Sequence, residues 1–195
     1  MFILGSSSEA RKNLLVQAGV TPALVVSPKV DEIIRRNEKP SDYVTRIALE
    51  KLENILVKIL VKEDDILLTA DTVVVIGRSV LDKTCDRSLA FKHLQALSGR
   101  RHKVLTSVYI KKSTKTVSFL TKTVVKMRLL SDFEIQNYLD SREWENKAGS
   151  YAIQGSALNF IHYISGCYAS VVGLPISKVL TKLQSFGYYK EKKND

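Results

Sequence analysis

The sequence has little of what secreted and membrane proteins need. Among 195 residues there are only two cysteines, Cys85 and Cys167, too few and too far apart for a disulfide scaffold or a CxxC site. No apolar run approaches the roughly 20 residues that a membrane-spanning helix requires. The first six residues turn polar too early and lack the basic region of a signal peptide, so they are expected to form a strand. We therefore expect a cytoplasmic protein without a membrane partner.

Metal-binding histidines and phosphate-binding glycine loops are also scarce. The three histidines, His93, His102 and His162, lack the spacing of a zinc site. His102 is expected to orient the turn at 98–100 and not to act as a base. The GxxxxGK[ST] spacing is missing as well, which excludes a Walker A loop. Zinc chemistry and P-loop nucleotide binding are therefore not predicted.

Acidic residues are outnumbered by basic ones. Lys and Arg total 30 against 20 Asp and Glu, a formal net charge of +10. This excess fits a nucleic-acid surface, an anionic small substrate, or no ligand at all. The basic clusters at 100–103, 111–115 and 190–193 lack the interleaved aromatic residues of a single-strand-binding platform, and the last two are expected to be solvated. Charge alone favours no function.

Composition and periodicity predict a globular α/β fold. Hydrophobic residues make up 45% of the chain and charged residues 26%, as in soluble globular proteins that bury a core. Strand and helix patterns alternate and one antiparallel hairpin interrupts them, which indicates a mixed twisted sheet flanked by helices. We expect one domain over residues 1–195, with room for two lobes around a central cleft. The expected strands are 2–6, 24–27, 66–76, 103–111, 116–129 and 151–153, and the expected helices are 9–18, 41–61, 86–99, 131–139 and 175–186.

One acid stands inside a very apolar stretch. Asp71 lies within residues 66–76, a run of β-branched and aliphatic residues typical of a buried strand. Burying an unpaired carboxylate costs several kcal/mol or shifts its pKa until it is neutral. Asp71 is therefore expected to be paired, to bind a metal, or to lie at a strand end that opens on a cleft. A turn or N-cap aspartate between two short strands is the alternative, and the run supports both interpretations equally.

Hydroxyl groups crowd the chain where the first expected strand meets the first helix, at Ser6, Ser7 and Ser8. Free N–H groups and the positive end of a helix dipole attract anions at such a place. Arg11 strengthens this interpretation, because it shares the inward face of the helix with apolar residues. An ordinary serine-capped helix with a snorkelling arginine is the simpler alternative. By itself the motif is weak.

Two lysines and a second acid raise the same question. Lys51 lies on the apolar face of its helix, Lys83 follows an apolar strand end, and Glu32 lies in a loop after a strand. Snorkelling lysines and an exposed acid would explain each residue alone. Taken together with Asp71 and Arg11, these residues indicate a ligand site that none of them indicates alone. Carboxylates bind Mg²⁺, and cations beside a helix N-terminus bind phosphates. Such a set is typical of phosphoryl or nucleotidyl chemistry.

The order of these motifs resembles the Maf family, the septum-formation-inhibitor-like nucleoside triphosphate pyrophosphatases. The matching stretches cover almost the whole chain: 4–8 with Arg11, 30–32, Ala48 with Lys51, 70–74, 81–83, 97–100 with His102, 148–155 and 171–175. The resemblance implies a cytoplasmic enzyme that uses Mg²⁺ or Mn²⁺ to cut a nucleoside triphosphate into the monophosphate and pyrophosphate. It also implies the fold of inosine-triphosphate pyrophosphatases and a homodimer.

The resemblance implies a role for each candidate residue. Asp71 looks like the proton acceptor for the attacking water, and Glu32 looks like its companion in binding the metal. Lys83 is placed with the catalytic residues. The remaining substrate-binding positions are Ser6, Ser8, Arg11 and Lys51 for the triphosphate, and Thr72 and Gln154 for the choice of base.

One departure bears on the substrate. Ala10 stands where the family pattern has the first arginine of a pair that is tied to substrate choice, so selectivity for pyrimidines does not follow from the resemblance. Candidate substrates are dTTP, UTP and modified nucleotides such as 7-methyl-GTP. Two alternatives stay open: an ITP- or XTP-type house-cleaning pyrophosphatase, and a basic nucleic-acid-binding regulator of cell division.

Overall fold

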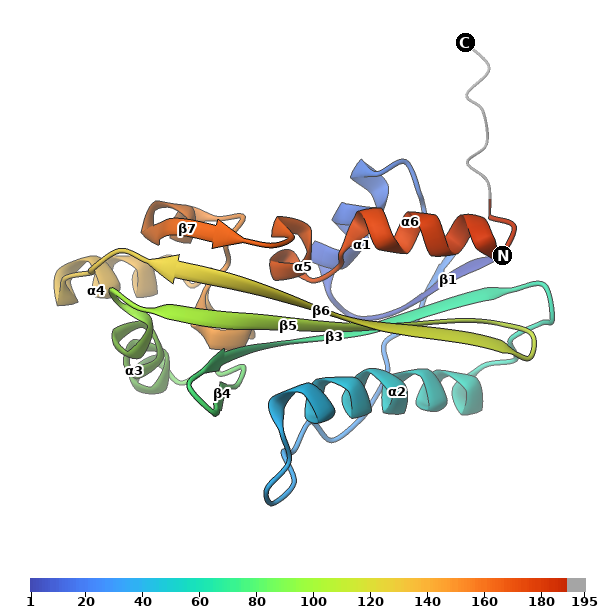
Figure 1. Ribbon diagram of the computed structural model, residues 1–195, viewed down its shortest axis with the longest axis horizontal. Helices are drawn as coiled ribbons and strands as arrows, with labels where there is room; N and C mark the ends of the chain where they lie inside the picture. The colour runs from blue at the N-terminus through green and yellow to red at the C-terminus, as the bar shows by residue number, and fades with distance from the viewer. Residues whose placement is uncertain (189–195) are drawn as a thin grey trace, which may run out of the picture.

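The apolar run that contains Asp71 forms β3, Ile66–Ile76, the strand on which the fold is built. The structure is a computed structural model that describes residues 1–188, so the basic tail at 190–193 lies outside the described residues. Within them, seven strands form one mixed sheet with helices on its faces, which confirms the predicted α/β class (Figure 1). The other strands are β1 Phe2–Gly5, β2 Leu24–Val25, β4 Ser79–Leu81, β5 Arg101–Lys112, β6 Lys115–Met127 and β7 Ile161–Ser165.

Three of the helices, α1 Glu9–Gln17, α3 Arg87–Leu97 and α4 Asp132–Asp140, begin at a side-chain cap that the sequence predicts. Ser8 accepts a hydrogen bond from the backbone of Arg11 at the start of the first helix, and Ser131 forms the predicted capping box with Glu134. The other helices are α2 Pro40–Lys58, α5 Tyr168–Val172 and α6 Ile176–Ser185, with 3₁₀ turns η1 Ala148–Ser150 and η2 Ser156–Phe160. No helix in the described part of the chain is both long and apolar enough to cross a bilayer.

The two faces of β3 are covered by different helices. Successive residues of a strand point to opposite faces. Leu68 and Ala70 belong to the core cluster that includes residues of α1 and α6, whereas Val73 and Val75 pack with the residues of α2. In Figure 1, α2 lies below the sheet, and α1, α5 and α6 lie above it. The neighbours Asp71 and Thr72 therefore face opposite sides of the sheet.

One edge of β3 is left open in the middle. β5 pairs with β3 along the whole of one edge, from Ile66 to Val75. The other edge is shared, because β1 pairs with residues 66–69 and β4 pairs with residues 74–76. Within the described chain no strand covers residues 70–73 on that second edge. The gap lies where β1 ends and α1 begins, which is the kind of place where open α/β sheets bind ligands.

The sequence prediction fails in the C-terminal third. Residues 151–153 were expected to form a strand, yet they form none and are buried as a loop, with Tyr151 and Ile153 in the core cluster of α3 and α4. The strand of this region is β7, which was not predicted. Its mostly exposed side chains do not alternate between apolar and polar, because it lies at the edge of the sheet beside β6. The short helix α5 was also missed.

Candidate active site

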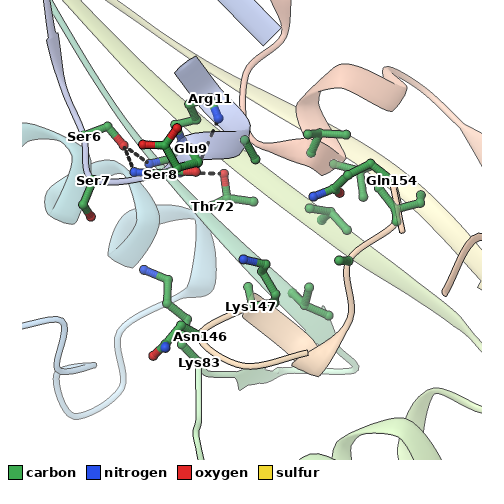
Figure 2. A pocket seen from close by; sticks show the side chains of 18 of the residues that line it. Ser6, Ser7, Ser8, Glu9, Arg11, Thr72, Lys83, Asn146, Lys147 and Gln154 are labelled. Atoms are coloured by element: carbon green, nitrogen blue, oxygen red, sulfur yellow. Dashed lines mark hydrogen bonds between the residues drawn. The ribbon is translucent and has the colours of Figure 1, made fainter. Parts of the chain in front are cut away.

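A cleft of about 560 Å³ opens at the gap in the edge of β3. Its lining includes most of the residues expected in the site: Ser6, Ser8, Arg11, Glu32, Lys51, Thr72, Lys83 and Gln154. Figure 2 shows the serines and Arg11 on one side of the cleft, Lys83 and Lys147 on the opposite side, and Gln154 at one end. Residues that are up to 148 positions apart in the sequence (6 and 154) thus meet in one cavity.

The amino end of α1 forms one wall. β1 ends at Gly5, and the chain enters α1 through the three serines, so the first N–H groups of the helix point toward the cleft. Ser6 accepts a hydrogen bond from the backbone N–H of Ser8 at 3.2 Å, and Ser8 accepts one from the backbone N–H of Arg11 at 3.4 Å. Backbone N–H groups and the helix dipole together favour an anion here.

Arg11 joins three parts of the fold. Its guanidinium donates from Nε to the carbonyl of Gly173 at 3.0 Å, from Nη1 to Ser6 Oγ at 3.1 Å and from Nη2 to Thr72 Oγ1 at 3.0 Å. Burial lowers the pKa of this guanidinium, while the charges of Asp71 and Glu32 act in the opposite direction. The side chain is 8% exposed, so it does not snorkel to the surface. Three of its five N–H donors are used in these hydrogen bonds, which leaves two for a ligand.

Asp71 is paired within the strand and does not lie in a turn. It occupies the sixth position of the 11-residue β3 and is 1% exposed. Its Oδ1 accepts a hydrogen bond from Lys51 Nζ at 2.6 Å. Lys51 is 6% exposed, which rules out the alternative of a snorkelling lysine. Asp71 itself is not part of the cleft lining, whereas its partner Lys51 is.

Glu32 extends the pair into a chain of four charges. Its two carboxylate oxygens contact Lys51 Nζ at 2.6 Å and Lys83 Nζ at 2.7 Å. Burial opposes ionisation of Glu32, but the charges of the two lysines and their hydrogen bonds outweigh it and lower its pKa to about 2. Glu32 is therefore a carboxylate at neutral pH, and the two acids and two lysines carry no net charge together.

The loop that carries Glu32 is fixed on α2. The hydroxyl of Tyr43 donates to the backbone carbonyl of Glu32 at 2.9 Å, and Arg46 donates to the carbonyl of Ile33 at 3.0 Å. Arg46 also forms an ion pair with Glu38 at 2.7 Å. These contacts hold a segment without regular secondary structure against α2. Glu32 thus contacts Lys51 and Lys83, and the alternative of an isolated, exposed loop acid does not hold.

The donor set fits a divalent cation only with help from a substrate. Within residues 1–188, no group of three or more His, Cys, Asp or Glu side chains could hold a metal ion. Glu32 and Asp71 both contact one ammonium, that of Lys51, so the two carboxylates already converge on a single positive charge. Mg²⁺ is usually held by one or two carboxylates, with water and substrate phosphates completing its coordination. These residues fit that pattern and do not form a closed metal cage.

Residues 146–154 form a second wall of the cleft, and of these residues only Gln154 was predicted to belong to the site. Asn146, Lys147 and Tyr151 line the cleft although none of them was among the candidates. His102 Nε2 hydrogen-bonds Tyr151 Oη at 2.8 Å, so the expectation that His102 orients the 98–100 turn was wrong. Burial lowers the pKa of His102 to about 4 and keeps it neutral. The sequence signal for this wall was the pair of polar residues Asn146 and Lys147, which directly precede the matching stretch 148–155.

Gly149 fixes the distance between this wall and β3. Its φ is +67°, and a Cβ atom added to it would lie 2.8 Å from Val74 Cγ1. We expect Gly149→Ala to lower the free energy of unfolding by roughly 2–4 kcal/mol, combining left-handed strain with overpacking. Urea denaturation measures the change.

Gly77 is the matched control for that substitution. Its φ is +60°, but nothing lies within 4 Å of an added Cβ. Gly77→Ala should therefore cost only the left-handed strain, about 1–2 kcal/mol. Equal losses for the two variants would show that Val74 yields to the added methyl group and that the wall is not rigid.

Comparisons with known proteins agree with the motifs. The model of a family described as Maf-like protein matches residues 1–186. The dTTP/UTP pyrophosphatase of Cereibacter sphaeroides is 44% identical over 185 residues, which cover 95% of this chain and 94% of the relative. The protein of the same name from Ruegeria sp. is 44% identical over 187 residues, 96% and 95% of the two chains. A nucleoside triphosphate pyrophosphatase of Ehrlichia ruminantium is 43% identical over 185 residues, 94% and 95%.

Proposed function

The chain belongs to the Maf family, and from this premise we propose that it is a hydrolase that cuts nucleoside triphosphates into the monophosphate and pyrophosphate. The observation that carries the proposal is the contact of Lys51 with both Asp71 and Glu32 at the gap in the sheet, across from the amino end of α1. A carboxylate, two lysines and an anion-binding helix end in one cleft suit hydrolysis of a phosphate anhydride.

The proposed reaction is attack by water on the α-phosphorus. A new bond forms between the water oxygen and the α-phosphorus, and the bond from that phosphorus to the oxygen bridging to the β-phosphate breaks. Asp71 takes the proton that the water loses. Lys83 and Lys51 offset the charge that grows on the departing pyrophosphate. Support comes from their contacts, since both ammonium groups are held within 2.7 Å of Glu32.

The remaining site residues position the substrate. Ser6, Ser8 and Arg11 are proposed to bind the phosphates at the amino end of α1, where two of the guanidinium N–H groups are available. Glu32 and Asp71 would hold a divalent cation, Mg²⁺ or Mn²⁺, which when bound supplies further positive charge beside the phosphates. Because the four charges of the cluster cancel, such added charge is what a triphosphate would need there.

Pyrimidine triphosphates are the proposed substrates. Relatives that are 44% identical carry the name dTTP/UTP pyrophosphatase. Thr72, which lies beside Ser8 in Figure 2, and Gln154, which lies at one end of the cleft, are proposed to select the base. Ala10 lines the same cleft. The small side chain in place of the family's arginine therefore leaves extra space beside the proposed phosphate site, and the backbone at this position still lines the cleft. We also propose that the protein is a homodimer, and that it is cytoplasmic, which the two free cysteines favour.

A panel of triphosphates tests the proposal. Purified protein is given dTTP, UTP, CTP, ITP, XTP and 7-methyl-GTP with Mg²⁺ or Mn²⁺, and pyrophosphate and orthophosphate are measured separately. We expect pyrophosphate from dTTP and UTP, and no activity when the metal is chelated. Preference for ITP or XTP would select the house-cleaning alternative. Release of orthophosphate alone would exclude a pyrophosphatase, and salt-sensitive DNA binding without hydrolysis would favour the nucleic-acid-binding regulator.

A further inference from the structure

The charges of the cleft are almost all engaged by the protein itself. Lys51 and Lys83 are paired with carboxylates. Arg11 is held by three oxygen acceptors. Lys147 also lines the cleft, and among the described residues it has no ion pair and its ammonium makes no hydrogen bond. It is therefore the one cation of the described cleft lining whose charge is fully available to an incoming anion.

Lys147 is carried by a segment that the fold holds firmly. Its backbone N–H donates to the carbonyl of Trp144 at 3.1 Å, and that of Asn146 donates to the carbonyl of Thr84 at 3.1 Å. Two residues later, Gly149 packs against Val74. Ser150 shares a hydrogen bond of 2.9 Å with His93 Nδ1. The ammonium is thus presented from a fixed wall, across the cleft from the serines of α1 (Figure 2).

The position of Lys147 along that wall indicates which phosphate it meets. The chain continues from Lys147 to Tyr151 and Gln154, and Tyr151 lines the cleft together with the apolar side chains of Val104 and Val172. Apolar and aromatic side chains suit a nucleobase, whereas the amino end of α1 suits phosphates. A nucleotide that spans the two would bring its first phosphate, the one attached to the nucleoside, nearest to Lys147.

We propose that Lys147 is a further substrate-contacting residue, whose ammonium binds the α-phosphate from the wall opposite α1. The inference rests on the proposed function, because it takes a nucleotide as the occupant of the cleft. Lys147 then remains bound to the monophosphate after cleavage, while the pyrophosphate is held by the amino end of α1 together with Lys51 and Lys83. The affinity for the two products should therefore depend on Lys147 to different degrees.

Binding of the two products tests the assignment without turnover. We compare Lys147→Gln with Lys122→Gln, which removes the same charge from an exposed lysine of β6 that is not part of the cleft lining. Calorimetry measures the dissociation constants for UMP and for pyrophosphate. Lys147→Gln should weaken UMP binding about tenfold or more, the usual effect of losing a hydrogen bond to a charged group. Its pyrophosphate binding, and both affinities of Lys122→Gln, should stay within about twofold of wild type.

The remaining outcomes each decide the question. Lys147→Arg should recover most of the UMP affinity, because it restores the charge. Unchanged UMP binding in Lys147→Gln, or a loss confined to pyrophosphate, would overturn the assignment even if the wild type hydrolyses triphosphates. A wild-type protein that hydrolyses no triphosphate and binds neither product would instead refute the proposed function, and this inference with it.

Discussion

Replacing Asp71 with asparagine is expected to lower kcat for triphosphate hydrolysis by about 10²- to 10⁴-fold, the usual contribution of a general base. Asparagine keeps the size of the side chain and an oxygen for Lys51 Nζ, which now lies 2.6 Å from Asp71 Oδ1. It cannot take a proton from water. Steady-state release of pyrophosphate measures the loss, and binding of UMP is expected to persist because Asp71 does not line the cleft.

Asp82 is the matched control for this substitution. It lies in the stretch just after β4. Burial raises its pKa, and the charges of Glu32 and Asp71 add to that rise, so Asp82 lies within the field of the same cluster. It is not part of the lining of the main cleft. Asp82→Asn should keep kcat within about threefold of wild type. If Asp71→Asn retains activity to the same degree, another group accepts the proton and the assignment of the base is wrong.

Replacing Lys51 with methionine should affect stability as well as activity. The ammonium is the described partner of Asp71, whose side chain is only 2% exposed, so its loss leaves a buried carboxylate unpaired. Breaking a buried pair in this way costs about 3–5 kcal/mol. For a chain of this size the melting temperature should fall by roughly 10 °C. Calorimetry or circular dichroism follows the transition, and hydrolysis should fall with it.

Lys83→Met separates the two effects. Lys83 contacts Glu32 but its side chain is 42% exposed, and exposed ion pairs contribute only about 0–1 kcal/mol. This variant should lose activity and keep its melting temperature within a few degrees. The double variant Lys51→Met with Asp71→Asn should regain part of the lost stability, since no unpaired charge remains at position 71. A Lys51→Met protein that melts like wild type would show that water reaches Asp71 and that the pair is not truly buried.

The structural features that depend on a few neighbouring residues could be predicted from the sequence. The 66–76 run became β3 with its predicted bounds, and the Ser131 capping box forms as expected. A charged residue on the apolar face of a helix also predicted a buried site residue correctly, because Arg11 and Lys51 occupy such positions and both are buried. In each case the spacing of a few neighbouring residues determines the outcome.

Features that depend on distant contacts were not predictable. The apolar residues at 151–153 resemble a strand, but they pack in a loop against α3 and α4 because β7 takes the edge of the sheet. Nothing near His102 in the sequence points to Tyr151, 49 residues away. Lys147 was missed for the same reason, since only the folded chain shows which lysines already have partners.

The gap in the edge of β3 also bears on solubility. Unpaired strand edges act as templates for strands of other molecules and so promote aggregation. Here the open stretch is four residues, 70–73, and it is closed off at one end by β1 and at the other by β4. A foreign strand would have to enter between these two, past the charged side chains of Lys51 and Glu32. The fold thus leaves a short stretch of strand edge unpaired beside the cleft and still denies it to another polypeptide.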